Sequence, residues 1–167
     1  MSKGVLIFAQ NNPEMDYIKL AMFAAKRIQD FLEVPVSLVT DSKDYLISSQ
    51  PTAEKVFDKI IDAWYDTDQV KKFHDGSMYE KNLKWNNFTR ADCFNLTPYK
   101  ETLVLDADYI ISSKNLSKIW ESQQDFLIYR KSYDLAQWRD TSSFTYINEH
   151  AIPFYWATAF YFKKTST

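Results

Sequence analysis

The first forty residues carry the pattern that most restricts how this chain can fold. Residues 5–9 form an unbroken apolar run, which is typical of a strand buried on both faces. A helix should follow, with Asn12 as its cap, Pro13 at its first position and apolar side chains at helical spacing as far as Leu32. Residues 36–40 form a second strand-like run. Strand, helix and strand in succession predict a βαβ unit, which requires a parallel pair of strands.

The rest of the chain extends this pattern with less regularity. We find no interdomain linker and expect one α/β domain over residues 1–167, with a mainly parallel sheet and flanking helices. The polar stretch 42–55 suggests no regular element. The elements expected further along are strands at 59–62, 103–105, 109–111, 126–129 and 155–162, a helix at 83–96 and helical turns at 115–122.

Glycine, cysteine and histidine are scarce, and their scarcity removes several enzyme classes. The only glycines are Gly4 and Gly76, so the chain cannot contain a P-loop, a GxGxxG dinucleotide motif or a GxSxG nucleophile elbow. The single cysteine, Cys93, excludes an intrachain disulfide and a cysteine-rich zinc site. His74 and His150 lie too far apart for an HExxH zinc helix.

Net charge and hydropathy restrict the partners. The formal net charge is −2, so the chain lacks the positive surplus that binding to nucleic acid or to an anionic membrane requires. No apolar stretch is long enough for a membrane span or for the core of a signal peptide. We therefore expect a cytoplasmic protein that contacts neither nucleic acid nor membrane.

The candidate chemistry lies at Asp106-Ala107-Asp108. The tripeptide pattern alone carries little information, because about one Asp-x-Asp is expected by chance at this aspartate content, and Asp66-Thr67-Asp68 is a second copy. The context of the first copy is informative, because it directly follows the apolar residues 102–105. In open α/β sheets, ligands bind at the carboxyl ends of the strands.

Two neighbouring carboxylates at such an edge repel each other and need a partner cation. Hard oxygen ligands suit Mg²⁺ or Mn²⁺, and these ions often complete their coordination shell with substrate phosphates. The alternative is that Asp106 and Asp108 form only a solvated turn, as aspartates often do. From these residues alone both interpretations stay open.

Residues 89–108 resemble the central segment of the GT-A fold nucleotide-sugar glycosyltransferases, and the glycogenin and galactinol synthase family in particular. That family shares a helix with a basic residue, an L-T-x-Y turn, an apolar strand and D-A-D. The resemblance implies a Rossmann-like GT-A fold in which Asp106 and Asp108 hold Mn²⁺ or Mg²⁺ against the diphosphate of a UDP-hexose donor. It also implies that Arg90, in place of the usual lysine, reaches the donor.

The beginning of the chain fits the same resemblance. Tyr17 stands where the family has the tyrosine that stacks on uracil; the alternative is an aromatic of the helix that packs on the sheet. The resemblance further implies that the nucleotide pocket is lined by Ala9, Gln10, Asn11, Asn12 and Ala107. Arg90 has its own plainer interpretation, as a solvated charge on a helix.

The resemblance weakens toward the end of the chain. Where the family has F-N-S-G-V-F, residues 155–160 place Trp156 and Thr158 at the asparagine and glycine positions. The family's motif that supplies a third metal ligand would lie beyond Thr167. We therefore expect a donor-binding part from which the acceptor side and the third ligand are missing.

These observations predict a metal-dependent glycosyltransferase with an unknown acceptor. No catalytic nucleophile or base can be named, and Asp125 and Glu149 would be the first candidates. A nucleotide-sugar-binding domain without turnover is the alternative. A phosphatase of the haloacid dehalogenase type also uses Asp-x-Asp after an apolar strand, but its motif normally lies near the N-terminus and is followed by threonine or serine rather than by Tyr109.

Overall fold

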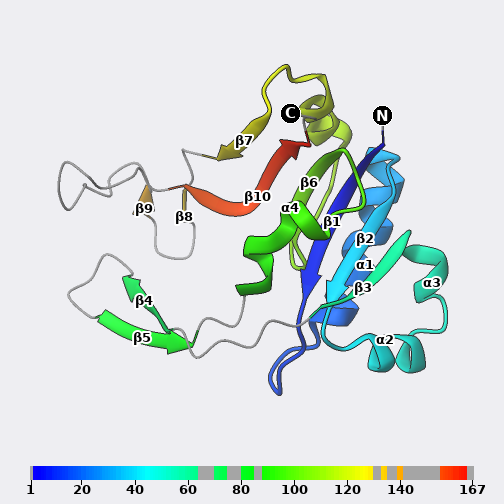
Figure 1. Ribbon diagram of the computed structural model, residues 1–167, viewed down its shortest axis with the longest axis vertical. Helices are drawn as coiled ribbons and strands as arrows, with labels where there is room; N and C mark the ends of the chain where they lie inside the picture. Colours follow the sequence, from blue (N-terminus) through cyan, green and yellow to red (C-terminus); the bar gives the residue numbers. More distant parts are fainter. Residues whose placement is uncertain are drawn as a thin grey trace.

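The computed structural model describes residues 2–63, 70–74, 80–84, 88–129, 133–134, 139–140 and 155–164. Its centre is a six-stranded sheet in the order β3-β2-β1-β6-β10-β7 (Figure 1). The sheet strands are β1 (Lys3–Ala9), β2 (Val36–Thr40), β3 (Lys59–Asp62), β6 (Glu101–Asp106), β7 (Phe126–Tyr129) and β10 (Trp156–Lys163). Two separate antiparallel pairs are β4 (Val70–His74) with β5 (Glu80–Lys84) and β8 (Tyr133–Asp134) with β9 (Arg139–Asp140).

The parallel part of the sheet is centred on β1. This strand pairs in parallel with β2 on one side and β6 on the other, and β2 pairs in parallel with β3. Strand β10 runs antiparallel to both β6 and β7. The predicted βαβ unit and the mainly parallel sheet are thus confirmed, and the carboxyl ends of β1, β2, β3 and β6 share one edge.

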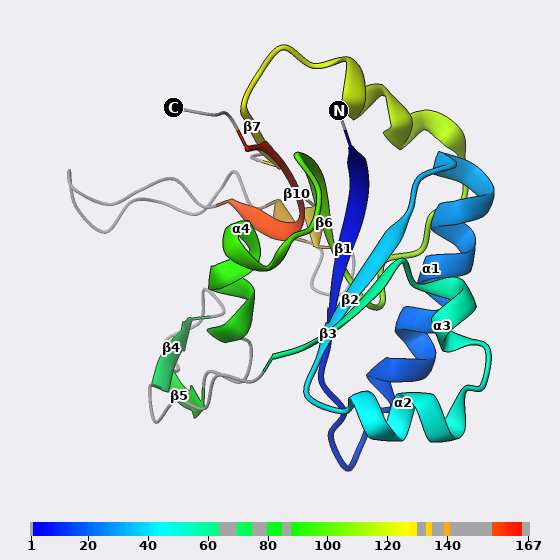
Figure 2. The same cartoon turned by 45° about the vertical axis from the view of Figure 1, so that its right-hand side comes forward.

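Helices cover the two faces of the sheet unequally. The helices α1 (Tyr17–Leu32), α2 (Lys43–Ser49) and α3 (Ala53–Val56) lie on one side, and the 3₁₀ helix η1 (Phe88–Asp92) with α4 (Cys93–Leu96) lies on the other (Figure 2). Side chains of β1 alternate between two hydrophobic clusters: Val5 and Ile7 pack in the cluster of α1, and Leu6 packs with Cys93. Cys93 is therefore a buried member of the core.

The start of α1 differs from the prediction. Asn12 does not cap the helix: its side-chain oxygen accepts hydrogen bonds from the backbone N–H groups of Glu14 and Met15, at 2.9 and 2.8 Å, which closes a separate turn. The helix begins at Tyr17 and its N-cap is Asp16. Both residue types serve equally well as caps, so spacing alone could not choose between them.

Two other segments also differ from the prediction. The helix expected over 83–96 is wrong in its first part, because β5 extends to Lys84; its end is present as η1 and α4. The strand expected at 109–111 is wrong, because the chain turns after β6 and the N–H of Tyr109 donates to the carbonyl of Asp106 at 3.0 Å. Ile111 is nevertheless buried, so its apolar character reflects packing without a strand.

Helical structure also occurs where the sequence suggested none. The polar stretch 42–55 holds α2 and most of α3, each of which buries only a few apolar side chains, among them Leu46 and Ala53. The helical turns expected at 115–122 form a 3₁₀ helix, η2 (Lys114–Glu121). The strands expected at 59–62, 103–105 and 126–129 are confirmed, and the strand expected at 155–162 is present as β10. Within the described residues no helix is long and apolar enough to cross a bilayer.

The buried side chain of Tyr99 contacts the amino ends of β1 and β2 and the residue before β3. Ser37 Oγ and Tyr99 Oη are 2.7 Å apart, and Tyr99 Oη donates to Asp58 Oδ2 at 3.2 Å. Burial raises the pKa of the Tyr99 phenol, so it stays protonated and available as a donor. A Cβ at Gly4 would approach the ring of Tyr99 to less than 3.0 Å. Gly4 is thus required by the close approach of this ring.

We expect Gly4→Ala to destabilise the fold by about 1–3 kcal/mol, the usual cost of overpacking a core. Urea unfolding measures this cost, and Lys3→Ala, at an exposed position of the same strand, is the control. In a Tyr99→Leu background the added methyl should cost clearly less, since the ring that it strikes has gone. A Gly4→Ala cost below about 0.5 kcal/mol, the range of ordinary surface changes, would contradict the packing argument.

Candidate functional site

Asp106 is placed by the register and alternation of β6. It ends the strand level with Phe8 of β1, and its side chain is on the face that also carries Val104. This is the face covered by η1 and α4, and η1 carries Arg90. The structure therefore brings two predicted donor-site residues together at the carboxyl edge of the sheet.

Arg90 and Asp106 form an ion pair between Nη1 and Oδ1. The second guanidinium nitrogen of Arg90, Nη2, donates to the carbonyl of Ala157 at 2.5 Å, and the guanidinium lies 5.5 Å from the centre of the Phe160 ring. The arginine is thus held by β6 on one side and by β10 on the other. Its side chain is only 12% exposed, whereas that of Asp106 is 29% exposed.

Burial shapes the electrostatics of this pair. It lowers the pKa of the Arg90 guanidinium to about 10, and the neighbouring Cys93 and Asp108 act in the opposite direction. The group is therefore still protonated at neutral pH. The shift caused by Asp108 also indicates that this second carboxylate lies within the field of the arginine.

Asp108 follows in the turn after β6 and is exposed, while Ala107 between the two aspartates is buried. The two carboxylates offer hard oxygen donors at a solvent-facing edge, which suits Mg²⁺ or Mn²⁺. Among the described residues, no cluster of three or more His, Cys, Asp or Glu side chains could hold a metal ion. A cation held by these two carboxylates would need further oxygen ligands from water or a substrate.

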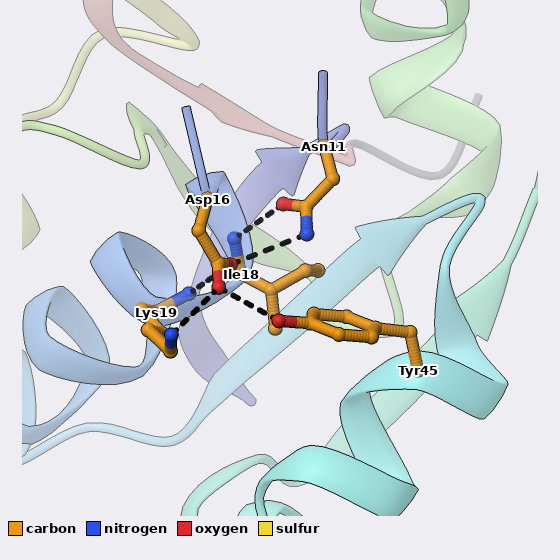
Figure 3. A network of polar contacts seen from close by, with 5 residues as sticks. All are labelled: Asn11, Asp16, Ile18, Lys19 and Tyr45. Atoms are coloured by element: carbon orange, nitrogen blue, oxygen red, sulfur yellow. Dashed lines mark hydrogen bonds and ion pairs between the residues drawn. The ribbon is translucent and has the colours of Figure 1, made fainter. Parts of the chain in front are cut away.

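The loop between β1 and α1 is held by a polar network centred on Asp16 (Figure 3). Its Oδ1 accepts from the N–H of Lys19 at 3.1 Å and from the amide of Asn11 at 3.2 Å. Its Oδ2 accepts from the hydroxyl of Tyr45 at 2.9 Å and lies 3.2 Å from the Lys19 ammonium. The Asn11 oxygen in turn accepts from the N–H of Ile18 at 3.0 Å. Two side chains therefore cap the first turn of α1.

Sequence reasoning missed Asp16, although a signal was present. Aspartate directly before an amphipathic stretch is a common N-cap, and Asp16 lies three positions before Lys19, from whose N–H it accepts a hydrogen bond. Partial burial alone raises the pKa of Asp16, but the hydrogen bonds from Lys19, Tyr45 and Asn11 outweigh this effect and lower it to about 2. The carboxylate is thus an integral part of the loop.

The predicted pocket residues of this loop have mixed placements. The side-chain oxygens of Asn11 and Asn12 are engaged by backbone N–H groups of the loop itself. Gln10 lines a cavity of about 10 Å³ at the ends of β1 and β2, which also borders Thr40 and Thr89. Such a volume is on the order of one water molecule, far too small for a nucleotide base. Ala9 is buried at the end of β1.

Tyr17 begins α1 and is half-buried against the hydrophobic cluster of that helix. It lies in the first turn of α1, at the same edge of the sheet as Asp106. This position is compatible both with stacking on a nucleotide base and with packing in the core. Asp125 lies away from the site, directly before β7. The first residue of β7, Phe126, pairs with Phe162 of β10, and Phe162 pairs with Thr102 at the amino end of β6. Glu149 lies outside the described residues, as does the side chain of Trp156.

A larger hollow lies on the opposite face of the sheet. It has a volume of about 240 Å³ and is bordered by η2, β6, β7 and β10, with Leu103, Leu116, Ile119 and Leu127 among its apolar lining. These side chains belong to the cluster of α1, whereas Asp106 faces η1. The hollow is therefore a separate surface, which the sequence did not indicate.

The arrangement of the described elements is similar to that of known transferases. A galactosyltransferase, LgtC, determined in complex with donor and acceptor sugar analogs, matches 96% of this chain and 57% of its own at 11% identity, with a TM-score of 0.57. The bifunctional IspDF from Campylobacter jejuni matches 98% of this chain and 41% of its own at 12% identity, with a TM-score of 0.51. The chain thus spans about half the length of these two structures.

No protein-family model and no curated protein sequence matches the chain. The structural likeness establishes the fold, a mixed and mostly parallel α/β sheet shared with nucleotide-diphospho-sugar transferases of the GT-A and IspD kind. The closer link to the glycogenin and galactinol synthase family stays a sequence resemblance.

We expect Asp16→Ala to lower the free energy of unfolding at pH 7 by about 1 kcal/mol, the usual cost of losing an N-cap. The folded-state pKa of Asp16 is depressed from 3.8 to about 2, so the carboxylate's contribution is complete above pH 3.8 and is lost as the pH falls toward 2. Urea unfolding between pH 7 and pH 3 should show the gap between variant and wild type shrinking with acid. Glu14→Gln, exposed in the same loop, is the control. A gap that stays constant over this range would contradict the role of the ionised cap.

Proposed function

We propose that the chain binds a nucleoside diphosphate sugar of the UDP-hexose class at the carboxyl edge of its sheet and transfers the sugar to a hydroxyl acceptor. The observation that supports this most is the placement of Arg90 and Asp106 as an ion pair at the end of β6, with Asp108 exposed in the following turn. Ligands of open α/β sheets bind at this edge. The fold is one that a sugar-transferring enzyme also has.

The charges of this edge match the needs of a departing diphosphate. Asp106 and Asp108 would hold Mg²⁺ or Mn²⁺, which when bound supplies Lewis-acid neutralisation of phosphate oxygens. Arg90 adds a permanent positive charge beside them, because its pKa of about 10 keeps it protonated at neutral pH. Preorganised charges of this kind stabilise the negative charge that develops on a leaving group.

The loop after β1 would form the nucleotide side of the site. Because the side chains of Asn11 and Asn12 bond to the loop's own backbone, we assign them to shaping the loop. Contacts to the nucleotide would then come from the loop backbone and from the ring of Tyr17. The half-buried position of this ring leaves part of it accessible for stacking.

A nucleotide-sugar-binding domain without turnover is the second candidate. It is favoured by the position of Asp125 at the far end of the sheet, which leaves no assigned base near Asp106 among the described residues. Release of hexose or a glycosylated product from UDP-hexose distinguishes the two candidates. Product above background requires the transferase, whereas binding without product indicates the binding domain.

We place either activity in the cytoplasm, where the buried thiol of Cys93 would stay reduced.

We expect UDP to stabilise the chain only when Mn²⁺ or Mg²⁺ is present, because Asp106 and Asp108 otherwise repel the diphosphate. A ligand at one hundred times its Kd adds about 2.7 kcal/mol, which raises the Tm of a chain of this size by roughly 5–10 °C. Thermal unfolding with UDP, with and without chelator, measures the shift.

The matched variants for this measurement are Asp108→Asn and Asp62→Asn. Both aspartates are exposed near the carboxyl ends of parallel strands, but only Asp108 belongs to the proposed metal pair. Asp108→Asn should abolish the metal-dependent part of the shift, and Asp62→Asn should keep it. An equal shift with and without chelator in the wild type would refute the proposed metal bridge.

We expect Tyr17→Ala to weaken UDP binding by about 1–3 kcal/mol, the usual worth of stacking a base on an aromatic ring. Calorimetry with UDP and Mg²⁺ measures the loss, and Tyr17→Phe should keep the affinity because the ring remains. Unchanged UDP affinity in a folded Tyr17→Ala variant would remove this residue from the site. Unfolding of that variant would instead assign the ring to the core that it borders.

A further inference from the structure

Arg90 forms an ion pair with Asp106, a carboxylate that a divalent cation would need as a ligand. Its Nη1 pairs with Asp106 Oδ1, and the guanidinium is almost completely enclosed by the sheet edge, whereas Asp108 is exposed. The chain therefore supplies its own counterion to one of the two proposed metal ligands. This arrangement leaves Asp108 as the more accessible carboxylate of the pair.

The guanidinium and a divalent cation compete for Asp106. A cation bound to the second oxygen of this carboxylate would lie a few Å from the Arg90 guanidinium. At that separation, repulsion between a single and a double positive charge is large compared with thermal energy, even at the effective dielectric of a protein surface. Both cations cannot be held well by the same carboxylate unless a further anion joins them.

The diphosphate of a nucleotide is such an anion. It would offer the guanidinium an alternative partner, because the planar guanidinium can donate two parallel hydrogen bonds to phosphate oxygens. Within the described residues, the other contacts of Arg90 are with the exposed carbonyl of Ala157 and the face of the Phe160 ring, and neither partner carries a charge. The register of β10 is also irregular between Trp156 and Phe160, where this carbonyl lies.

We propose that Arg90 is an exchangeable counterion that couples the binding of metal and nucleotide. In the free chain it neutralises Asp106 and weakens binding of the metal alone; when a diphosphate arrives, the guanidinium transfers to the phosphate and Asp106 becomes available to the cation. This inference rests on the proposed function, because it needs the same two aspartates to hold a metal. Linkage then requires that metal and nucleotide strengthen each other's binding by the same factor.

Binding of Mn²⁺, followed through the electron paramagnetic resonance signal of the free ion, tests the exchange. For the wild type we expect weak binding of Mn²⁺ alone and an affinity at least tenfold higher with saturating UDP. Arg90→Gln should bind Mn²⁺ alone at least tenfold more tightly than the wild type, with little further gain from UDP. An unchanged or weaker Mn²⁺ affinity in folded Arg90→Gln would overturn the exchange.

Arg27→Gln is the matched control. Arg27 also donates to a backbone carbonyl, that of Ile111 at 3.1 Å, and lies 4.3 Å from the ring centre of Phe31. It thus shares with Arg90 a carbonyl and an aromatic partner, but belongs to α1 on the other face of the sheet. Its replacement should leave Mn²⁺ binding and the effect of UDP unchanged. A tightening as large as that of Arg90→Gln would indicate a general charge effect and overturn the exchange.

A measurement on the wild type covers the case in which Arg90→Gln does not fold. In arginine-labelled protein, the guanidinium NMR signals that Asp106→Asn identifies as those of Arg90 should move with Mg²⁺ and UDP together but not with Mg²⁺ alone. Signals that stay in place with both, or move equally with Mg²⁺ alone, would overturn the exchange. Wild-type protein that binds neither Mn²⁺ nor Mg²⁺ with UDP would overturn the proposed function as well, whereas cooperative wild-type binding with unmoved Arg90 signals would overturn only the exchange.

Discussion

The pairing of β1 with two parallel neighbours is the constraint on which the rest of the structure depends. Val5, Leu6 and Ile7 are completely buried, so this strand has neither a free face nor a free edge. The register sets Asp106 level with Phe8, and alternation along β6 turns its side chain toward η1. A slip of one residue would turn it to the α1 face instead, away from Arg90.

The sequence was most informative where a strand is buried on both faces. The runs at 5–9, 36–40 and 103–105 are continuous because neither face meets water, and each was predicted as a strand. Apolar character misled at 109–111, since Ile111 packs in the core from a turn. The two short helices in the polar stretch 42–55 were missed because each buries very few side chains, which leaves hardly any periodicity to detect.

The candidate site was predictable in position but not in its contacts. A carboxylate that directly follows a buried parallel strand lies at the carboxyl edge of the sheet, so the place of Asp106 and Asp108 in the fold could be predicted from sequence. The partners of Arg90 could not, because they lie 16 and 67 residues away along the chain. Asn11 and Asn12 show a different limit: an amide oxygen accepts a backbone N–H as readily as it would a ligand group, and residue type does not distinguish the two uses.

The position of β10 has a consequence for how the molecule is made. It is the last strand of the described chain, yet it lies inside the sheet, between β6 and β7. During synthesis from the N-terminus, β1, β2, β3 and β6 can pair while β10 is still untranslated, and β6 then presents a row of unpaired backbone groups. The same late insertion delivers the Ala157 carbonyl to Arg90. A nascent chain without β10 would therefore have an exposed, aggregation-prone edge on β6 and would lack one partner of Arg90. Pairing of β10 with β6 removes both defects at once.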